Sequence, residues 1–155
     1  MIEQVRPQID GGRFPIKRVV SELVAVEAVV FADGHDALAC RILYRHADDQ
    51  EWQPAPTEPL GNDNWRGEFL VSKLGRYEYT VEGWIDRFAT WRGDLVKRIA
   101  AGQDIRMDCL IGAVLVEAAA AQAPAEDAAL LRQWAYSLRE KRALARSTTT
   151  NSGLV

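Results

Sequence analysis

The spacing of apolar residues divides the chain into two parts. From the N-terminus to about residue 93, apolar and polar residues alternate in short runs separated by polar turns, as in strands with one buried face. Beyond that point the apolar residues recur every three or four positions, as on one face of a helix. The pattern predicts a β-sandwich over residues 1–93, a helical part over 94–146 and a disordered tail over 147–155.

The clearest strand pattern lies in the stretch LGRYEYTVEGWIDRFATWRGD, residues 74–94. Aromatic and β-branched residues alternate there with charged ones as far as Ile85, which fits a half-buried pleated surface. A second aromatic pair, Phe88 and Trp91, follows before the glycine that ends the stretch. We expect this to be the last strand before the chain leaves the sheet.

The upstream strands are shorter and separated by turns. The almost continuously apolar run 23–31 predicts a central strand covered on both faces. Asp33–Gly34 after it predicts a hairpin to a strand over 37–46, because glycine accepts the positive φ of the reversal. Further strands are predicted at residues 13–20, 51–53 and 65–71. Six or seven short strands with polar turns are typical of an antiparallel sandwich.

About three α-helices are predicted after the sandwich. Asp94 can cap a short helix over 95–101, and Asp104 or Asp108 can cap a second. Pro124 ends the second helix and begins a third. The apolar faces at 110–119 and 130–138 are wide and must be buried against the sandwich or a second copy. We therefore expect a dimer or larger species.

Charge and cysteine usage narrow the class of protein. Nineteen Lys and Arg against 22 Asp and Glu give a net charge of −3, which argues against nucleic-acid binding or attachment to a membrane surface. Cys40 and Cys109 lie in apolar surroundings of the sequence and are expected to be buried and reduced. No apolar run is long enough to cross a membrane. These features predict a cytoplasmic protein.

The sequence offers little catalytic chemistry. His35 and His46 are expected to be solvated residues at a turn and a strand end rather than metal ligands or bases. No catalytic, cofactor-binding or metal site is predicted, since no nucleophile elbow, phosphate-binding loop or cysteine–histidine cluster occurs. Trp84 and Trp91 are candidates for a sugar platform, because sugar rings stack on exposed aromatic planes; packing in a core is the alternative.

Several blocks of the sequence agree, in order and spacing, with one family. They are VRPQIDGGRFPIKRVV, VFADGHDALACRILYRH, LGNDNWRGEF, LGRYEYTVEGWIDRFATWRGDL and KRIAAGQD. Together they resemble the N-terminal domain of the bacterial α-1,4-glucan:maltose-1-phosphate maltosyltransferases, from about Ile2 to Ala121. The resemblance implies an immunoglobulin-like sandwich ahead of an α-amylase-type barrel, with a helical insertion before the last strand of the sandwich.

The resemblance also implies a function for the whole enzyme. That enzyme moves maltosyl units from α-maltose 1-phosphate to an α-1,4-glucan with retention of configuration, and its two carboxylates belong to the barrel. A barrel alone needs roughly 250 residues, so no catalytic residue can be carried over and the chain alone should be inactive. The expected partners are the barrel domain, a second copy of the chain and an α-glucan. A stand-alone glucan-binding module or an unrelated interaction domain is the alternative.

Overall fold

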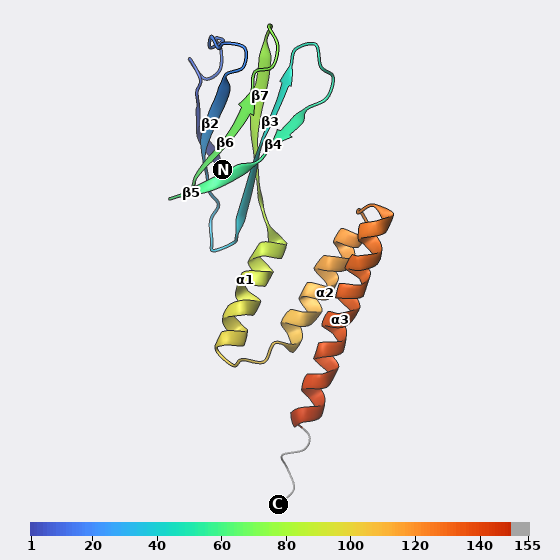
Figure 1. The fold of residues 1–155 in the computed structure, drawn as a ribbon. Coiled ribbons are helices and arrows are strands. Elements are labelled where there is room, and N and C mark those ends of the chain that lie inside the picture. The colour runs from blue at the N-terminus through green and yellow to red at the C-terminus, as the bar shows by residue number, and fades with distance from the viewer. Residues whose placement is uncertain (150–155) are drawn as a thin grey trace, which may run out of the picture. The chain divides into compact units, whose positions relative to one another are not determined.

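The computed structural model describes the backbone of residues 1–149 and the side chains of residues 1–140. The described chain folds as seven strands followed by three helices (Figure 1). These elements form two compact units, Met1–Ile85 and a second that begins at Asp86. The predicted class, mainly β with a helical C-terminal part, is confirmed.

The first unit consists of two antiparallel sheets. One has the strand order β1-β2-β6-β5 and the other the order β4-β3-β7. The strands are β1 (Ile2–Arg6), β2 (Leu23–Val30), β3 (Leu38–His46), β4 (Gln53–Ala55), β5 (Thr57–Gly61), β6 (Asn64–Leu70) and β7 (Tyr77–Ile85).

The inner faces of the two sheets form the core of the sandwich. Val24 and Val26 of β2, Ile42 of β3 and Phe69 of β6 belong to one buried cluster, each at most 5% exposed. β2 is central in its sheet, as predicted, but the prediction that both its faces are covered is wrong. Its burial alternates strictly, and Leu23 on the other face is 60% exposed.

The predicted hairpin between β2 and β3 is also wrong. Gly34 does turn the chain with a φ of +105°, but β2 and β3 belong to different sheets and do not pair. The turn carries the chain across the sandwich, a crossing that a local Asp-Gly signal cannot distinguish from a hairpin. A true hairpin joins β5 to β6 through Asn62 and Asp63, both with positive φ.

One predicted strand is absent from the structure, and two edge strands were not predicted. The strand predicted over 13–20 is irregular backbone, and only an isolated bridge pairs Ile9 with Phe14. Pro15 cannot donate to a sheet, which explains the lost strand. β1 and β5 were missed, because the few alternating residues of β1 and the proline in β5 give weak strand signals.

The helices are α1 (Arg87–Ala100), α2 (Arg106–Ala120) and α3 (Ala125–Thr149). The prediction that Asp94 caps α1 is wrong: Asp86 is the N-cap, and its carboxylate accepts from the Ala89 N–H at 2.8 Å. The N-cap of α2 is Ile105, so the predicted caps Asp104 and Asp108 are wrong, although the Asp104 side chain accepts from the Arg106 N–H at 3.0 Å. The tail predicted over 147–155 is helical to Thr149, and its remainder lies outside the described residues.

The second unit is built on a hairpin of α2 and α3, which lie side by side and antiparallel (Figure 1). Ala113 and Ala135 are fully buried between them, and Val116 is 4% exposed. Small side chains at this interface let the two helix backbones approach closely. α1 packs on α2 at Gly112, where a Cβ would lie 2.0 Å from the Trp91 ring.

Candidate functional site

The outer face of β3 and β7 carries the most unusual set of side chains. In the register of these strands, Arg41 lies opposite Glu82 and Arg45 opposite Glu78. The Arg41 Nε donates to Glu82 at 2.7 Å, and the Arg45 Nη2 donates to Glu78 at 2.9 Å. Two ion pairs therefore lie in parallel across the strands.

A tryptophan accompanies each ion pair. The Arg41 guanidinium carbon lies 5.8 Å from the centroid of Trp84, and that of Arg45 lies 4.5 Å from the centroid of Trp52. Both distances are within cation–π range. Trp84 remains 45% exposed and Trp52 38% exposed. We call this set the outer sheet face: Arg41, Arg45, Trp52, Glu78, Glu82 and Trp84.

The two predicted platform residues lie in different surroundings. Trp84 is on the outer sheet face, where its ring is half-exposed. Trp91 lies in α1, where its Nε1 donates to the Asp108 carbonyl at 2.7 Å and its ring covers Gly112. Trp91 therefore holds α1 against α2, and the sugar-platform hypothesis rests on Trp84.

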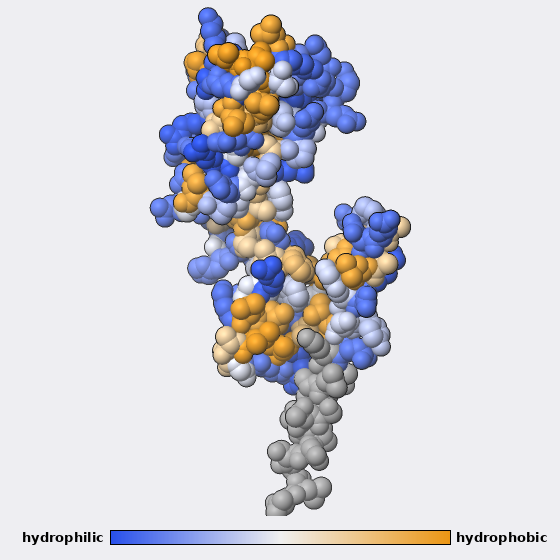
Figure 2. All heavy atoms as spheres, in the orientation of Figure 1, coloured by the Kyte–Doolittle hydropathy of each residue, from blue (hydrophilic) through white to orange (hydrophobic). Residues whose placement is uncertain are grey.

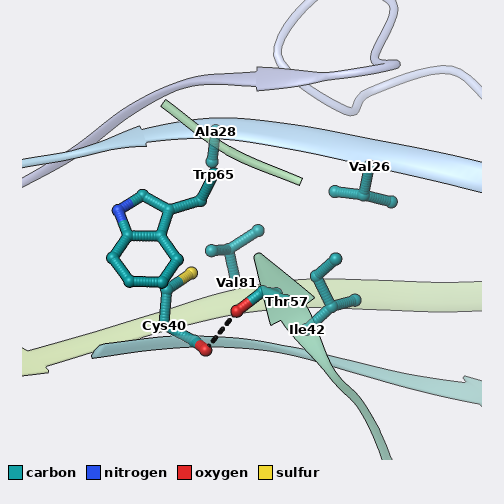
Figure 3. A pocket seen from close by; sticks show the side chains of 7 residues that line it. All are labelled: Val26, Ala28, Cys40, Ile42, Thr57, Trp65 and Val81. Carbon is teal, nitrogen blue, oxygen red and sulfur yellow. Dashed lines mark hydrogen bonds between the residues drawn. The ribbon is translucent and has the colours of Figure 1, made fainter. Parts of the chain in front are cut away.

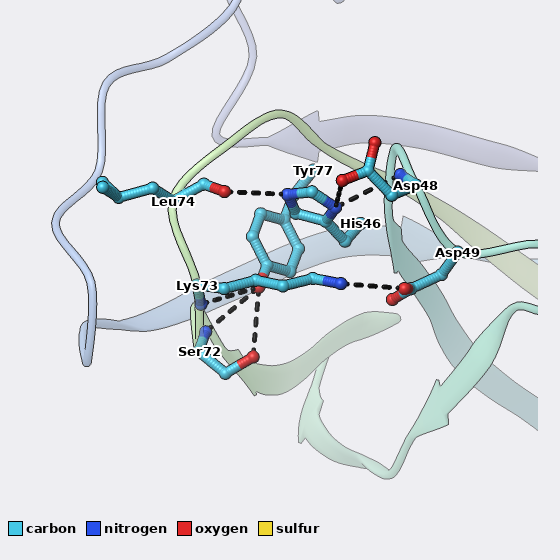
Figure 4. Close-up of polar contacts among 7 residues, drawn as sticks. All are labelled: His46, Asp48, Asp49, Ser72, Lys73, Leu74 and Tyr77. Atoms are coloured by element: carbon cyan, nitrogen blue, oxygen red, sulfur yellow. Dashed lines mark hydrogen bonds and ion pairs between the residues drawn. The ribbon is translucent and has the colours of Figure 1, made fainter.

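His46 is buried, contrary to the expectation that it is solvated. Its Nδ1 accepts from the Asp48 N–H at 3.2 Å, so its Nε2 carries the proton and donates to the Leu74 carbonyl at 3.0 Å (Figure 4). Gly75 lies against the ring, since a Cβ there would be 2.1 Å from Nε2. Both ring nitrogens are engaged with the backbone, so His46 joins two loops rather than serving as a base.

Tyr77 anchors the same end of the sandwich. Its ring meets His46 edge-on at a centroid distance of 5.0 Å, and its hydroxyl accepts from the N–H groups of Ser72 and Lys73 (Figure 4). Lys73 also donates to Asp49 at 2.9 Å, and this contact lowers the pKa of the Asp49 carboxyl. The network joins the loops around β3 and β7.

The interior of the sandwich has no ligand cavity at its centre. Seven residues from both sheets surround a gap that leaves no space for a water-sized sphere (Figure 3). Thr57 donates through its hydroxyl to the Cys40 carbonyl there, and burial raises the pKa of the Cys40 thiol. A buried thiol with a raised pKa is a poor nucleophile. Among the residues that the structure describes, no group of three or more His, Cys, Asp and Glu could hold a metal ion.

The helical unit exposes several large apolar side chains at its surface (Figure 2). On α2, Met107, Ile111 and Val114 follow one another at helical spacing and are 49–63% exposed. On α3, Leu130 and Trp134 are also one helical turn apart, and their side chains are 46% and 51% exposed. Val114 follows the interface residue Ala113 by one position and Trp134 precedes Ala135 by one, so in this antiparallel pair the two rows lie on different sides of the hairpin. We use the name hairpin face for these five residues together. The apolar stretches 110–119 and 130–138 were predicted to be buried, and they are so only in part: Ala113, Val116 and Ala135 lie in the hairpin interface, whereas Ile111, Val114, Leu130 and Trp134 are about half-exposed.

The edge of β7 is a third feature. β7 pairs along its whole length with β3, and within the described residues it has no partner on its other edge. Its inward residues Tyr77, Tyr79 and Val81 are only half-buried, whereas Val26 on the central β2 is 1% exposed. The sandwich is therefore less well covered along β7 than at its centre.

No described helix is long and apolar enough to span a bilayer.

The outer sheet face was only partly found from the sequence. Trp84 and its neighbours Glu78 and Glu82 were recognised as one strand face, but Arg41, Arg45 and Trp52 were not joined to them. The alternating arginines of β3 and glutamates of β7 are the signal that could have found the pairs. Each pair depends on the register between β3 and β7, because Arg45 and Glu78 are 33 positions apart in the sequence and Arg41 and Glu82 are 41 apart. A local sequence pattern does not determine such a register.

Comparison with known proteins identifies the family. The family model for α-1,4-glucan:maltose-1-phosphate maltosyltransferase, domain N/S, matches residues 1–153. A protein of that name from Chlorobaculum tepidum is 46% identical over 134 residues, which cover 86% of this chain and 20% of the relative.

Two further relatives carry the same name. The one from Myxococcus xanthus is 44% identical over 147 residues, covering 90% of this chain and 22% of its own length. The one from Methylacidiphilum infernorum is 37% identical over 142 residues, covering 92% and 21%. The chain thus spans about a fifth of the length of these relatives. By the family model and these identities, the chain belongs to the family of N/S domains of α-1,4-glucan:maltose-1-phosphate maltosyltransferases.

Proposed function

We propose that the chain is the non-catalytic N-terminal domain of a maltosyltransferase that acts on maltose 1-phosphate and an α-1,4-glucan. In this proposal the sandwich attaches to the catalytic part of the enzyme and the helices associate two subunits. The observation that carries it is the hairpin face, because five large apolar side chains at helical spacing are costly to leave in water.

Subunit association follows from the geometry of that face. Ile111 and Val114 of α2 and Leu130 and Trp134 of α3 are each about half-exposed. A second copy of the hairpin presents the same residues, so that the α2 row of one copy can pack on the α3 row of the other. Light scattering of the chain at tens of micromolar should therefore give the mass of a dimer.

Charge substitutions on the hairpin face test this association. Ile111→Asp and Trp134→Asp each place a carboxylate where the second copy would pack, and each should give a monomer. Gln133→Asp adds the same charge to the same helix beside Trp134 and should remain a dimer. Far-ultraviolet circular dichroism checks that all three variants stay helical. A wild-type monomer under these conditions would contradict the proposal.

Attachment to the rest of the enzyme is supported by the edge of β7. A strand added there would satisfy the outward N–H and C=O groups of β7 and cover Tyr79 and Val81. Hydrogen exchange should be faster at the outward amides of β7 than at those of β3 in the isolated chain. The same amides should become protected when the complete enzyme of a relative is measured, and unchanged exchange would speak against attachment at this edge.

The lack of catalysis by the chain alone is tested directly. The chain mixed with maltose 1-phosphate and a maltooligosaccharide should release no phosphate above the buffer rate, and a rate that survives purification would refute this part. The same proposal places the protein in the cytoplasm, and the buried thiols of Cys40 and Cys109 support a reducing compartment.

A further inference from the structure

We propose that the outer sheet face binds a linear oligosaccharide, with Trp84 as the main stacking surface and Trp52 as a second. The assignment of the ligand as an α-1,4-linked glucan rests on the proposed function. The binding itself rests on the side chains of β3 and β7 and on the residue that precedes β4.

The two tryptophans have the exposure and support that sugar stacking needs. Trp84 lies opposite Ala39, a small side chain that leaves its ring uncovered on that side, and is 45% exposed. The guanidinium groups of Arg41 and Arg45 lie against the two rings and restrict their rotation. Rings held in place before binding lose less entropy when a sugar stacks on them.

The charges of this face favour an uncharged ligand. Arg41 is paired with Glu82 and Arg45 with Glu78, and Arg76 lies 3.8 Å from the other carboxylate oxygen of Glu78, so four of these five charges cancel. An anion at Arg41 or Arg45 would have to separate that arginine from its glutamate, and a cation at Glu78 or Glu82 would have to separate that glutamate from its arginine. A sugar hydroxyl can donate to a carboxylate oxygen or accept from a guanidinium while the pair stays closed. The side chains of Arg41 and Glu82 remain 50% and 43% exposed, so that a ligand can reach the donors and acceptors not used within the pair.

The spacing of the rings favours a chain of several sugars over a single one. Trp84 is level with Ala39 on β3, and Trp52 is next to Gln53, which pairs with Tyr44. The five to six residues of β3 between these levels correspond to about 16–20 Å at the rise of a strand. The Arg41–Glu82 pair lies between these two levels, and the Arg45–Glu78 pair lies at the level of Trp52. A linear oligosaccharide laid along β3 would meet an aromatic ring near each end and the two ion pairs along its path.

The experiment is a titration of the full chain with maltoheptaose, followed by amide and tryptophan side-chain shifts in NMR spectra. We expect saturable shifts at millimolar ligand, confined to β3, β7 and the segment before β4. Trp84→Ala should weaken binding about tenfold or more, as the loss of a central aromatic anchor does. Trp52→Ala should weaken it less, and maltose, which is too short for both rings, should bind more weakly than maltoheptaose.

Two controls separate this site from general effects. Tyr136→Ala removes a 64% exposed aromatic ring from α3 and should leave the affinity unchanged. Arg66→Ala disrupts the Arg66–Glu68 ion pair in the other sheet and should also leave it unchanged. The folded state of every variant is checked by its dispersed NMR spectrum.

Several outcomes would overturn the proposal. Absence of saturable shifts would do so, as would undiminished binding by Trp84→Ala. Equal binding of a β-1,4-linked oligosaccharide would overturn the α-glucan assignment. If the face instead responds to the catalytic part of a relative and not to maltoheptaose, it is a protein interface. A chain that forms dimers but does not bind maltoheptaose refutes this inference alone, and a monomer that binds it refutes only the dimer.

Discussion

Gly112 offers the sharpest test of how the helical unit is assembled. It lies inside α2, and an added Cβ would lie 2.0 Å from Cζ2, 2.4 Å from Cε2 and 2.7 Å from Cη2 of Trp91. Carbon atoms in contact lie about 3.5–4.0 Å apart, so the ring would have to withdraw by about 1.5 Å. The ring cannot withdraw freely, because its Nε1 donates to the Asp108 carbonyl at 2.7 Å.

The magnitude follows from two opposed terms. Replacing a helical glycine by alanine stabilises the helix by about 1 kcal/mol. Overpacking typically costs about 1–3 kcal/mol, and the loss of the Trp91 hydrogen bond adds about 1 kcal/mol more. We therefore expect Gly112→Ala to lower the free energy of unfolding by about 1–3 kcal/mol.

Gly93 in α1 supplies the matched control. It is also a helical glycine, but an added Cβ there meets nothing within 4 Å. Gly93→Ala should therefore raise the free energy of unfolding by about 0.5–1 kcal/mol, since only the helix-propensity term acts. Urea unfolding monitored at 222 nm, at one fixed protein concentration, compares the two variants.

If the two alanine variants change the free energy of unfolding in the same direction by the same amount, the close contact with Trp91 does not set the effect at Gly112. The same substitution in a Trp91→Leu background tests whether the Trp91 ring causes the effect. In Trp91→Leu the ring is absent, and Gly112→Ala should then become neutral or stabilising. A destabilisation that persists without the ring would show that the close approach to Trp91 is not what makes glycine necessary at this position.

The remaining predictions concern the sandwich and the start of α1. Gly75→Ala should unfold or strongly destabilise the sandwich, because φ is +136° and a Cβ would lie 2.1 Å from His46. Gly34→Ala has a φ of +105° but open space around the added Cβ, so it should lower the free energy of unfolding by only about 1–2 kcal/mol, as measured by thermal unfolding. Asp86→Ala should cost about 1 kcal/mol through the lost N-cap, whereas Asp86→Asn should be nearly neutral and Asp94→Ala should not affect the cap. His46→Leu should destabilise the sandwich by about 1–3 kcal/mol, because the Leu74 carbonyl and the Asp48 N–H lose their partner, and a variant as stable as wild type in urea would contradict that role.

The strands that carry the core were predictable because their periodicity reflects burial. β3 and β6 alternate in the sequence and, over their central residues, in their burial. The pairing of strands was less predictable. Asp33–Gly34 signals a reversal, but which sheet the next strand joins depends on contacts with β4 and β7 far along the chain.

The boundary between strand and helix failed for a different reason. Phe88 and Trp91 have high strand propensity, and they extended the predicted strand beyond Ile85. The cap at Asp86 and the packing of Trp91 on Gly112 override that propensity. A carboxylate three residues before Ala89 was a visible signal, but Asp94 offered an equally plausible one.

The candidate site shows the same limit at the level of side chains. Trp84 could be placed on the charged face of its strand from sequence alone. Trp52 could not, because it lies outside the regular strands and reaches the face through its contact with Arg45. Aromatic content raised the sugar hypothesis equally for Trp84 and Trp91, and only the contacts of each ring distinguish them.

The outer sheet face and the hairpin face suit two different kinds of partner. On the outer sheet face, each arginine and glutamate satisfies the other, so the face is stable in water while empty and suits a ligand that comes and goes. The hairpin face has no such internal compensation, because Ile111, Val114 and Trp134 gain only by being covered. A surface of that kind favours a lasting protein contact. Association of subunits and reversible binding of a glucan therefore need not compete for the same residues, and substitutions on one face should leave the other function unchanged.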